Sequence, residues 1–104
     1  MRENIVFNEE TVAKIKKYVN NPYAYGRISP WRVCARELYV NCLGGTNSGY
    51  SKTYFACIKN IMDNITGWEW DTHKSHHMAY LDKQKCWVNN TFREKYSPYK
   101  KKLN

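Results

Sequence analysis

The chain has 104 residues, enough for one domain with one modest hydrophobic core. Its 17 Lys and Arg residues outnumber its 9 Asp and Glu residues, which gives a formal net charge of +8. Such an excess attracts anionic partners and speeds encounter with them, nucleic acid first and an acidic protein surface second. No stretch approaches the ~20 apolar residues that a membrane span needs, so we expect no membrane-spanning segment.

The N-terminus and the cysteines indicate a protein of the cell interior. Residues 1–7 lack the apolar region of a signal peptide. The cysteines form no C-x-x-C pair, and their spacing to histidines matches no zinc finger. We therefore expect a cytoplasmic protein with buried thiols and no disulfides at Cys34, Cys42, Cys57 and Cys86. The abundance of Asn, Lys, Tyr and Ile, as AT-rich coding would give, favours a phage or viral source, and the location would then be the host cell interior.

The first predicted helix begins after Asn8, whose side chain can cap the free amides of the first turn. Pro22 disfavours a helical residue before it, so the helix ends at about that point. Apolar side chains recur between these limits at helical spacing, and they predict a buried stripe of Val12, Ile15, Tyr18 and Val19. Residues 23–28 then form a brief strand or an extended link.

Ser29 and Pro30 predict the start of a second helix, because Ser is a good cap and Pro suits the first helical position. Gly44 and Gly45 end this helix, and one of them can take the left-handed conformation of a C-cap. The predicted apolar stripe of this helix is Trp31, Cys34, Leu38 and Cys42.

A polar connection at residues 46–49 leads to a third helix, predicted over residues 50–65. Its buried line is Tyr54, Ile58, Ile61 and Ile65, with Phe55 and Met62 beside it. After Gly67 the periodicity changes, and residues 68–72 alternate apolar and charged side chains as a half-buried strand does. Residues 77–81 and 86–89 predict two further strands, joined by a polar hairpin turn at 82–85. Residues 93–104 form a basic tail that we expect to fray.

This order predicts an α+β fold of three helices followed by a small antiparallel β-hairpin or meander. It resembles the topology of a winged helix-turn-helix, with residues 1–92 as a single domain and 93–104 as a tail. The third helix would be the recognition helix and the hairpin tip the wing. The connection at 44–49 is longer than the turn of about 3–4 residues that is usual for the motif.

The exposed positions of the third helix and of the hairpin carry side chains that suit nucleic acid. Lys can reach phosphate or guanine, Asn can pair with adenine, and Ser and Thr can bond either phosphate or bases. The basic tail adds an attraction that is independent of sequence and weakens with salt. The predicted nucleic-acid-binding residues are Ser51, Lys52, Thr53, Lys59, Asn60, Lys83, Lys85, Arg93, Lys100, Lys101 and Lys102. An ordinary solvated helix face is the competing interpretation, and the hypothesis requires the lysines at 52, 59, 83 and 85 to share one side of the folded chain.

The favoured hypothesis is therefore a small basic regulatory protein that binds nucleic acid, DNA ahead of RNA, and that uses no cofactor. The alternative is an accessory protein that binds an acidic host protein through basic and aromatic side chains and inhibits or redirects it. The sequence leaves the target and the oligomeric state open, a homodimer included.

A third hypothesis is a metal-dependent nuclease, because a metal needs several converging ligands and the chain holds one acidic and histidine-rich segment. The candidate ligands are Glu69, Asp71, His73, His76 and His77. Their spacing matches no zinc or H-N-H nuclease pattern, and a solvated turn between strands explains the segment equally well. We therefore predict no metal site and no enzymatic activity.

Overall fold

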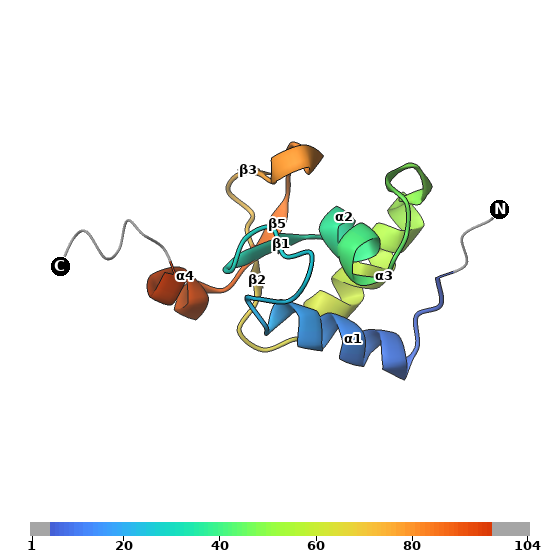
Figure 1. Ribbon diagram of the computed structural model, residues 1–104, viewed down its shortest axis with the longest axis horizontal. Coiled ribbons are helices and arrows are strands. Elements are labelled where there is room, and N and C mark those ends of the chain that lie inside the picture. Colours follow the sequence, from blue (N-terminus) through green and yellow to red (C-terminus); the bar gives the residue numbers. More distant parts are fainter. Residues whose placement is uncertain (1–4, 97–104) are drawn as a thin grey trace.

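Strand β5 (Cys86–Val88) is the centre of a three-stranded antiparallel sheet in the computed structural model, which describes residues 5–96. It pairs with β1 (Arg32–Cys34) on one side and with β2 (Glu69–Trp70) on the other, so the strand order is β1–β5–β2. A second antiparallel pair, β3 (His76–His77) with β4 (Lys83–Gln84), continues from β2 and β5. The helices pack around these strands (Figure 1), which confirms the predicted α+β class.

The described residues form four α-helices, where the sequence predicted three: α1 (Glu9–Val19), α2 (Ala35–Glu37), α3 (Lys52–Met62) and α4 (Asn90–Tyr96). The additional helix is α4, which runs across the expected boundary at residue 92. It forms because the Asn89 side chain accepts a hydrogen bond from the Phe92 amide at 2.9 Å, and because the Phe92 ring packs edge-on against Trp68. The remainder of the predicted tail, residues 97–104, lies outside the described residues.

Helix α1 begins as predicted, with the Asn8 side chain accepting a hydrogen bond from the Thr11 amide at 3.0 Å. Ile15, Tyr18 and Val19 are buried, but Val12 is 40% exposed and Thr11 takes the fourth buried position. Thr11 is buried because its hydroxyl donates to the Val6 carbonyl, which ties the preceding segment to the helix.

The second helix begins later than predicted, because residues 32–34 pair with β5 and form β1. Ser29 makes a turn contact with the Trp31 amide instead of a helix cap. The cap is Cys34, whose sulfur accepts from the Glu37 amide at 3.4 Å, and α2 starts at Ala35. Pairing of the buried Val33 and Cys34 with β5 therefore outweighs the local Ser-Pro signal.

Helix α2 continues into a π-helical turn, η1 (Leu38–Cys42), in which the Leu43 amide bonds the Leu38 carbonyl at 2.9 Å. Gly44 ends this helix at φ +81°, the left-handed conformation predicted for one of the two glycines. Gly45 lies against Tyr39, so closely that a Cβ atom there would lie 2.3 Å from the ring. A short 3₁₀ turn, η2 (Asn47–Gly49), leads to α3, which is capped by Ser51.

The hairpin after β2 turns earlier than predicted. The expected strand at 77–81 is reduced to β3, and the chain reverses through a 3₁₀ turn, η3 (Ala79–Leu81), so that the expected turn residues 83 and 84 form β4. The reversal occurs there because Met78 and Leu81 are buried in a small apolar cluster with Cys34 and Cys86. We call β2, β3, β4 and β5 with their connections, residues 69–88, the ribbon.

Residues 20–30, for which the sequence predicted a brief strand or an extended link, form successive turns held by a buried guanidinium group. Arg27 donates hydrogen bonds of 2.6–3.1 Å to four carbonyls, those of Tyr18, Val19, Asn21 and Ser29. Its Nε lies 3.8 Å from a carboxylate oxygen of Glu37, which is fully buried and also accepts from the Tyr18 hydroxyl at 2.6 Å. Arg27 thus joins the end of α1, the turns and α2.

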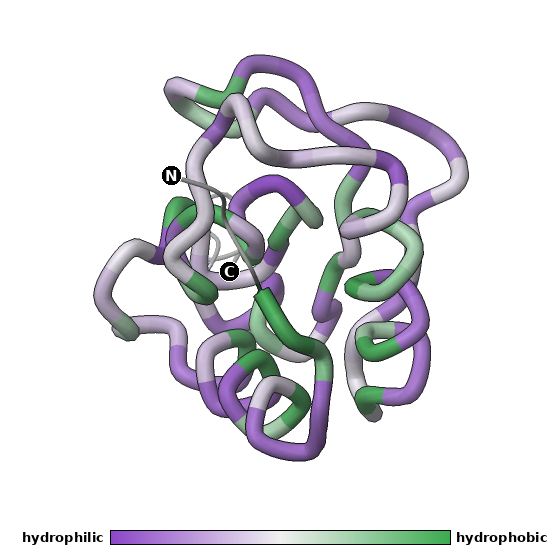
Figure 2. The backbone as a smooth tube through the Cα atoms, turned by 90° about the vertical axis from the view of Figure 1, so that its right-hand side faces the viewer, coloured by the Kyte–Doolittle hydropathy of each residue, from purple (hydrophilic) through white to green (hydrophobic). Residues whose placement is uncertain are grey.

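The main core lies between α1, α3 and the sheet, and the predicted line of α3 is largely confirmed. Ile58, Ile61 and Ile65 are buried, and Tyr54 is half-buried. Trp68 and Trp87 are buried in this core, and Trp70 packs against it half-buried. Hydrophilic and hydrophobic residues alternate along the turns of the helices in Figure 2, as expected where one side of each helix packs inward.

The four cysteines are free thiols. Cys34 and Cys86 are buried and face each other across β1 and β5, whereas Cys42 and Cys57 are only half-buried, so the prediction of four core thiols is right for two of them. Burial raises the pKa of both Cys34 and Cys86 to about 12, so neither forms a reactive thiolate at neutral pH.

Replacing Arg27 with Met should lower the free energy of unfolding by about 3 kcal/mol. The substitution leaves several carbonyls without their hydrogen-bond donor and a buried carboxylate without its cation. Urea denaturation of the full chain measures the change. Lys16→Met on the exposed side of α1 is the control, and it should change stability by no more than about 0.5 kcal/mol. Equal effects of the two substitutions would show that the Arg27 network contributes nothing.

Candidate nucleic-acid interface

The exposed side of α3 carries the five side chains that the sequence assigned to it. Lys52, Ala56 and Lys59 follow one another at spacings of four and three residues, which places them on one line of the helix, and Thr53 and Asn60 lie beside that line. Ser51 stands at the start, where its hydroxyl accepts from the Tyr54 amide at 3.4 Å. Ser51 therefore acts first as a helix cap, and the other four project from the helix.

Lys59 is already engaged within the protein. Its ammonium group lies 2.7 Å from a carboxylate oxygen of Asp63 and 5.7 Å from the centre of the Trp70 ring. The hydrogen bond from Lys59 holds the pKa of Asp63 below its usual range, and Asp63 also accepts from the Trp87 indole at 3.2 Å. These contacts join the end of α3 to the sheet. Lys52 forms no ion pair with any residue in the range 5–96, so its positive charge is less neutralised than that of Lys59.

The ribbon carries Lys83 and Lys85, which the sequence assigned to the wing. Exposure alternates along this stretch: both lysines are exposed, Gln84 is half-buried and Cys86 is buried. Strand geometry puts every second side chain on one face, so the two lysines share the face of Trp87. Because Trp87 bonds Asp63 at the end of α3, that face is the one that α3 covers. Strand alternation therefore predicts that Lys83 and Lys85 lie on the side of the sheet that α3 covers.

Arg93 lies elsewhere. It is exposed on α4, and its guanidinium group lies 4.8 Å from the centre of the Trp31 ring, next to β1 at the opposite edge of the sheet from β2. Arg32 approaches the same ring at 4.9 Å. Figure 1 shows α4 at one end of the molecule and the start of α3 at the other. The remaining predicted contacts, Lys100, Lys101 and Lys102, lie outside the described residues.

The histidines do not converge on a common point. His76 is buried and bonds Asp71 through Nε2 at 2.7 Å, whereas His77 is the next residue of the same strand and is exposed. Arg32 contacts Nδ1 of His76 at 3.3 Å, and a guanidinium group can only donate, so the ring proton lies on Nε2 and is donated to Asp71. Among residues 5–96, no group of three His, Cys, Asp or Glu side chains is arranged to hold a metal. The segment instead fastens the ribbon to β1.

Three exposed tyrosines were not identified from the sequence. Tyr23, Tyr25 and Tyr80 are 79%, 97% and 64% exposed. Their positions depend on the turns at 20–30 and at 78–82. Periodicity carries no signal for such turns.

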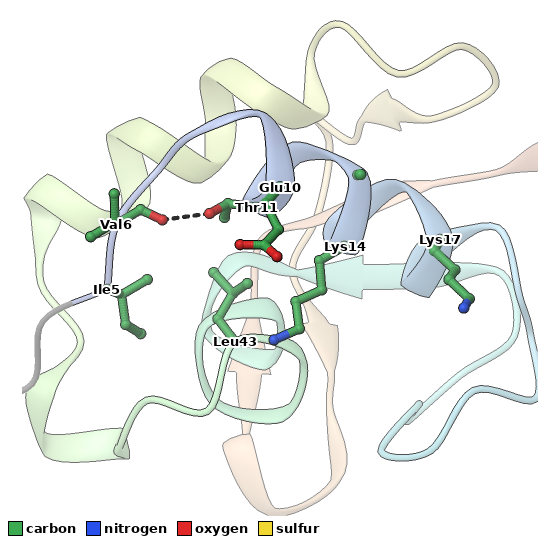
Figure 3. Close-up of a pocket in the computed structure, with 8 residues that line it drawn as sticks. Ile5, Val6, Glu10, Thr11, Lys14, Lys17 and Leu43 are labelled. Carbon is green, nitrogen blue, oxygen red and sulfur yellow. Dashed lines mark hydrogen bonds between the residues drawn. The ribbon is translucent and has the colours of Figure 1, made fainter.

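A hollow of about 550 Å³ lies between the start of α1, the segment before it and Leu43. Figure 3 shows Lys14 reaching towards Leu43 and Lys17 projecting farther along the same helix. Ile5 and Val6 form the other wall. No group of catalytic side chains lines this hollow, since Glu10 is its one acidic residue and no histidine or cysteine is among the described residues that line it.

Comparison of the chain with protein-family models, with curated proteins and with solved structures found no match. Within residues 5–96, no helix is both long enough and apolar enough to cross a membrane.

The Asp71→Asn substitution should destabilise the protein in a pH-dependent way. Hydrogen bonds from the His73 amide, from His76 and from the Lys74 amide lower the pKa of Asp71 from 3.8 to about 2. A lowered pKa in the folded state stabilises the protein above the unfolded-state pKa, and this contribution is lost as the pH falls towards the folded-state value. Urea denaturation between about pH 7 and about pH 2.5 should therefore show a stability difference from wild type that shrinks in acid. A difference that stays constant with pH would contradict the assignment.

Proposed function

We propose that this chain is a small regulatory protein that binds nucleic acid, duplex DNA in preference to RNA, through α3 and the ribbon. The proposal assigns Lys52 and Lys59 of α3 and Lys83 and Lys85 of the ribbon to one side of the molecule, which strand alternation and the bond between Trp87 and Asp63 at the end of α3 support. Charges gathered in this way create a local positive potential that a uniformly spread excess does not. A phosphate backbone is the polyanion with the matching charge density.

The order of the elements supports a winged helix-turn-helix arrangement for this binding. A helix and a short strand precede α2, η1 and α3, and the antiparallel ribbon follows, with β1 as the third strand of its sheet. In that arrangement α3 is the recognition helix and the ribbon is the wing. The tip of the ribbon is folded back, because the Tyr80 hydroxyl donates to Asn41 at 2.7 Å. Lys83 of β4 and Lys85 after it, and not the tip, are therefore the part of the wing that meets the ligand.

The side chains on α3 suit a duplex major groove. Lys52 at the start of the helix can reach phosphate or guanine, and Asn60 offers the amide that pairs with adenine. Thr53 between them can bond phosphate. An α-helix fits the major groove of B-form DNA, whereas the major groove of an RNA duplex is too narrow to admit one. DNA is for this reason the preferred duplex.

Charge reversal at Lys52 or Lys85 should weaken binding to a mixed-sequence DNA duplex. Loss of one phosphate contact lowers the slope of log K against log salt by about 0.9, which corresponds to about eightfold in affinity at about 0.1 M salt. Fluorescence anisotropy with a labelled duplex, repeated at several salt concentrations, measures both quantities for Lys52→Glu and Lys85→Glu.

Lys95→Glu on α4 is the matched control, since it makes the same change in net charge at the far end of the molecule. It should weaken binding less than either of the other two variants. Equal losses of affinity in all three variants would show that binding depends on net charge alone and not on the position of the lysines. Absence of salt-sensitive binding by the wild type would refute the proposal.

The exposed tyrosines favour a second candidate function, an accessory protein that binds an acidic host protein and inhibits or redirects it. Tyrosine is enriched at the centres of protein interfaces, where its ring gives a large contact area. A pull-down from nuclease-treated host lysate separates the two functions. A partner that is retained after nuclease and lost in a Tyr25→Ala variant supports this candidate, whereas retention that depends on nucleic acid supports the first.

A further inference from the structure

A groove of about 300 Å³ runs between α1, the turns at 20–30 and η1. None of the residues that line it belongs to α3 or to the ribbon, so it is separate from the duplex surface proposed above. Its lining is Lys14, Lys17, Tyr18, Asn21, Ala24, Tyr25, Asn41 and Cys42. We call this surface the tyrosine groove.

The backbone next to Tyr25 is held in place by hydrogen bonds from Tyr18 and Asn41. The carbonyl of Gly26 accepts a hydrogen bond from the Asn41 side chain at 2.8 Å, and it lies 2.9 Å from the Tyr18 hydroxyl, whose single proton it shares with Glu37. Gly26 has φ +91°, and a Cβ atom there would lie 3.1 Å from Asn41, so glycine is required for this close approach. The next residue, Arg27, is held in place by the hydrogen bonds of its guanidinium group. A ring displayed on such a backbone loses little entropy when it binds a ligand.

Tyr80 reaches the same wall of the groove from the tip of the ribbon. Its hydroxyl donates to the Asn41 carbonyl oxygen at 2.7 Å, while the amide of Asn41 supports Gly26. One side chain of η1 thus holds both the Tyr80 hydroxyl and the backbone next to Tyr25, and the two tyrosines remain largely exposed. They form a pair of aromatic platforms beside the groove.

The charge of the groove selects an anionic occupant. Lys14 and Lys17 line it, and none of the described residues that line it is acidic. An acidic peptide would usually anchor an apolar side chain in an enclosed pocket, but Tyr25, which lines this groove, is 97% exposed. An exposed π-face next to cations is the arrangement with which proteins hold unpaired bases and their phosphates.

We propose that the tyrosine groove binds a single-stranded stretch of nucleic acid, with Tyr25 stacking on a base and Lys14 and Lys17 contacting phosphates. Tyr80 supplies the second stacking surface. This inference goes beyond duplex binding and does not depend on it, since none of the lysines assigned to the duplex lines the groove. If both hold, the preferred ligand is a junction between duplex and single strand.

The test is binding of fluorescein-labelled oligo(dT) of twelve nucleotides to the full chain at low salt, followed by anisotropy. Tyr25→Ala should weaken this binding by about tenfold, which is within the range found when a stacked base loses its aromatic partner. Tyr25→Phe should retain most of the affinity, because the ring remains. Lys17→Glu should weaken binding and lower its dependence on salt. Duplex binding by Tyr25→Ala should match the wild type, which also shows that the variant is folded.

Three results would overturn the inference. The first is no binding of oligo(dT) by the wild type, and the second is equal binding by Tyr25→Ala and the wild type. The third is binding of poly-L-glutamate, in place of oligo(dT), with the same dependence on Tyr25, which would assign the groove to an acidic protein segment. Loss of duplex binding alone would refute the proposed function and leave this inference standing.

Discussion

The interaction on which the structure depends most is the buried contact between Arg27 and the groups around it. Its guanidinium group satisfies carbonyls at the end of α1 and in the turns that follow, and it faces Glu37 on α2. Burial raises the pKa of Glu37, an effect that the hydrogen bond from Tyr18 and the charge of Arg27 oppose. Neither charge could be buried alone without a large loss of solvation energy, so each requires the other. The pair therefore fixes α1, the turns and α2 as one unit.

That unit determines which parts of the chain are left to meet a partner. With α1 and η1 joined on one side, α3 packs its apolar side against the sheet through Phe55 and Trp70 and turns its polar side outward. The ion pair of Lys59 with Asp63 and the indole bond of Trp87 fasten α3 to β5. The same unit displays Tyr25 on the other side of α1. Two chemically different surfaces, one a row of lysines and one a tyrosine-edged groove, thus follow from a single packing arrangement.

Features with local causes were predictable from the sequence, and features with distant causes were not. The Asn8 cap and the helical spacing of apolar residues located α1 and α3 to within a few residues, and the same spacing identified the exposed row of α3. Strand β1 overrode the Ser29–Pro30 signal because its partner lies more than fifty residues away, and α4 depends on the packing of Phe92 against Trp68. The hairpin turn moved because Met78 and Leu81 are buried, which forces positive φ angles at Ala79 and Asp82. The tyrosine groove needs the Arg27 turns, for which no periodic pattern exists.

The central claim is that α3 and β4 together form the face that meets nucleic acid. Titration of the ¹⁵N-labelled chain with a short unlabelled DNA duplex, followed by assigned amide chemical shifts, tests it most directly. The largest shifts should occur at residues 52–60 and 83–85, with small changes along Lys14 to Tyr25. Largest shifts outside those two segments, or no shifts at duplex concentrations above that of the protein, would contradict it.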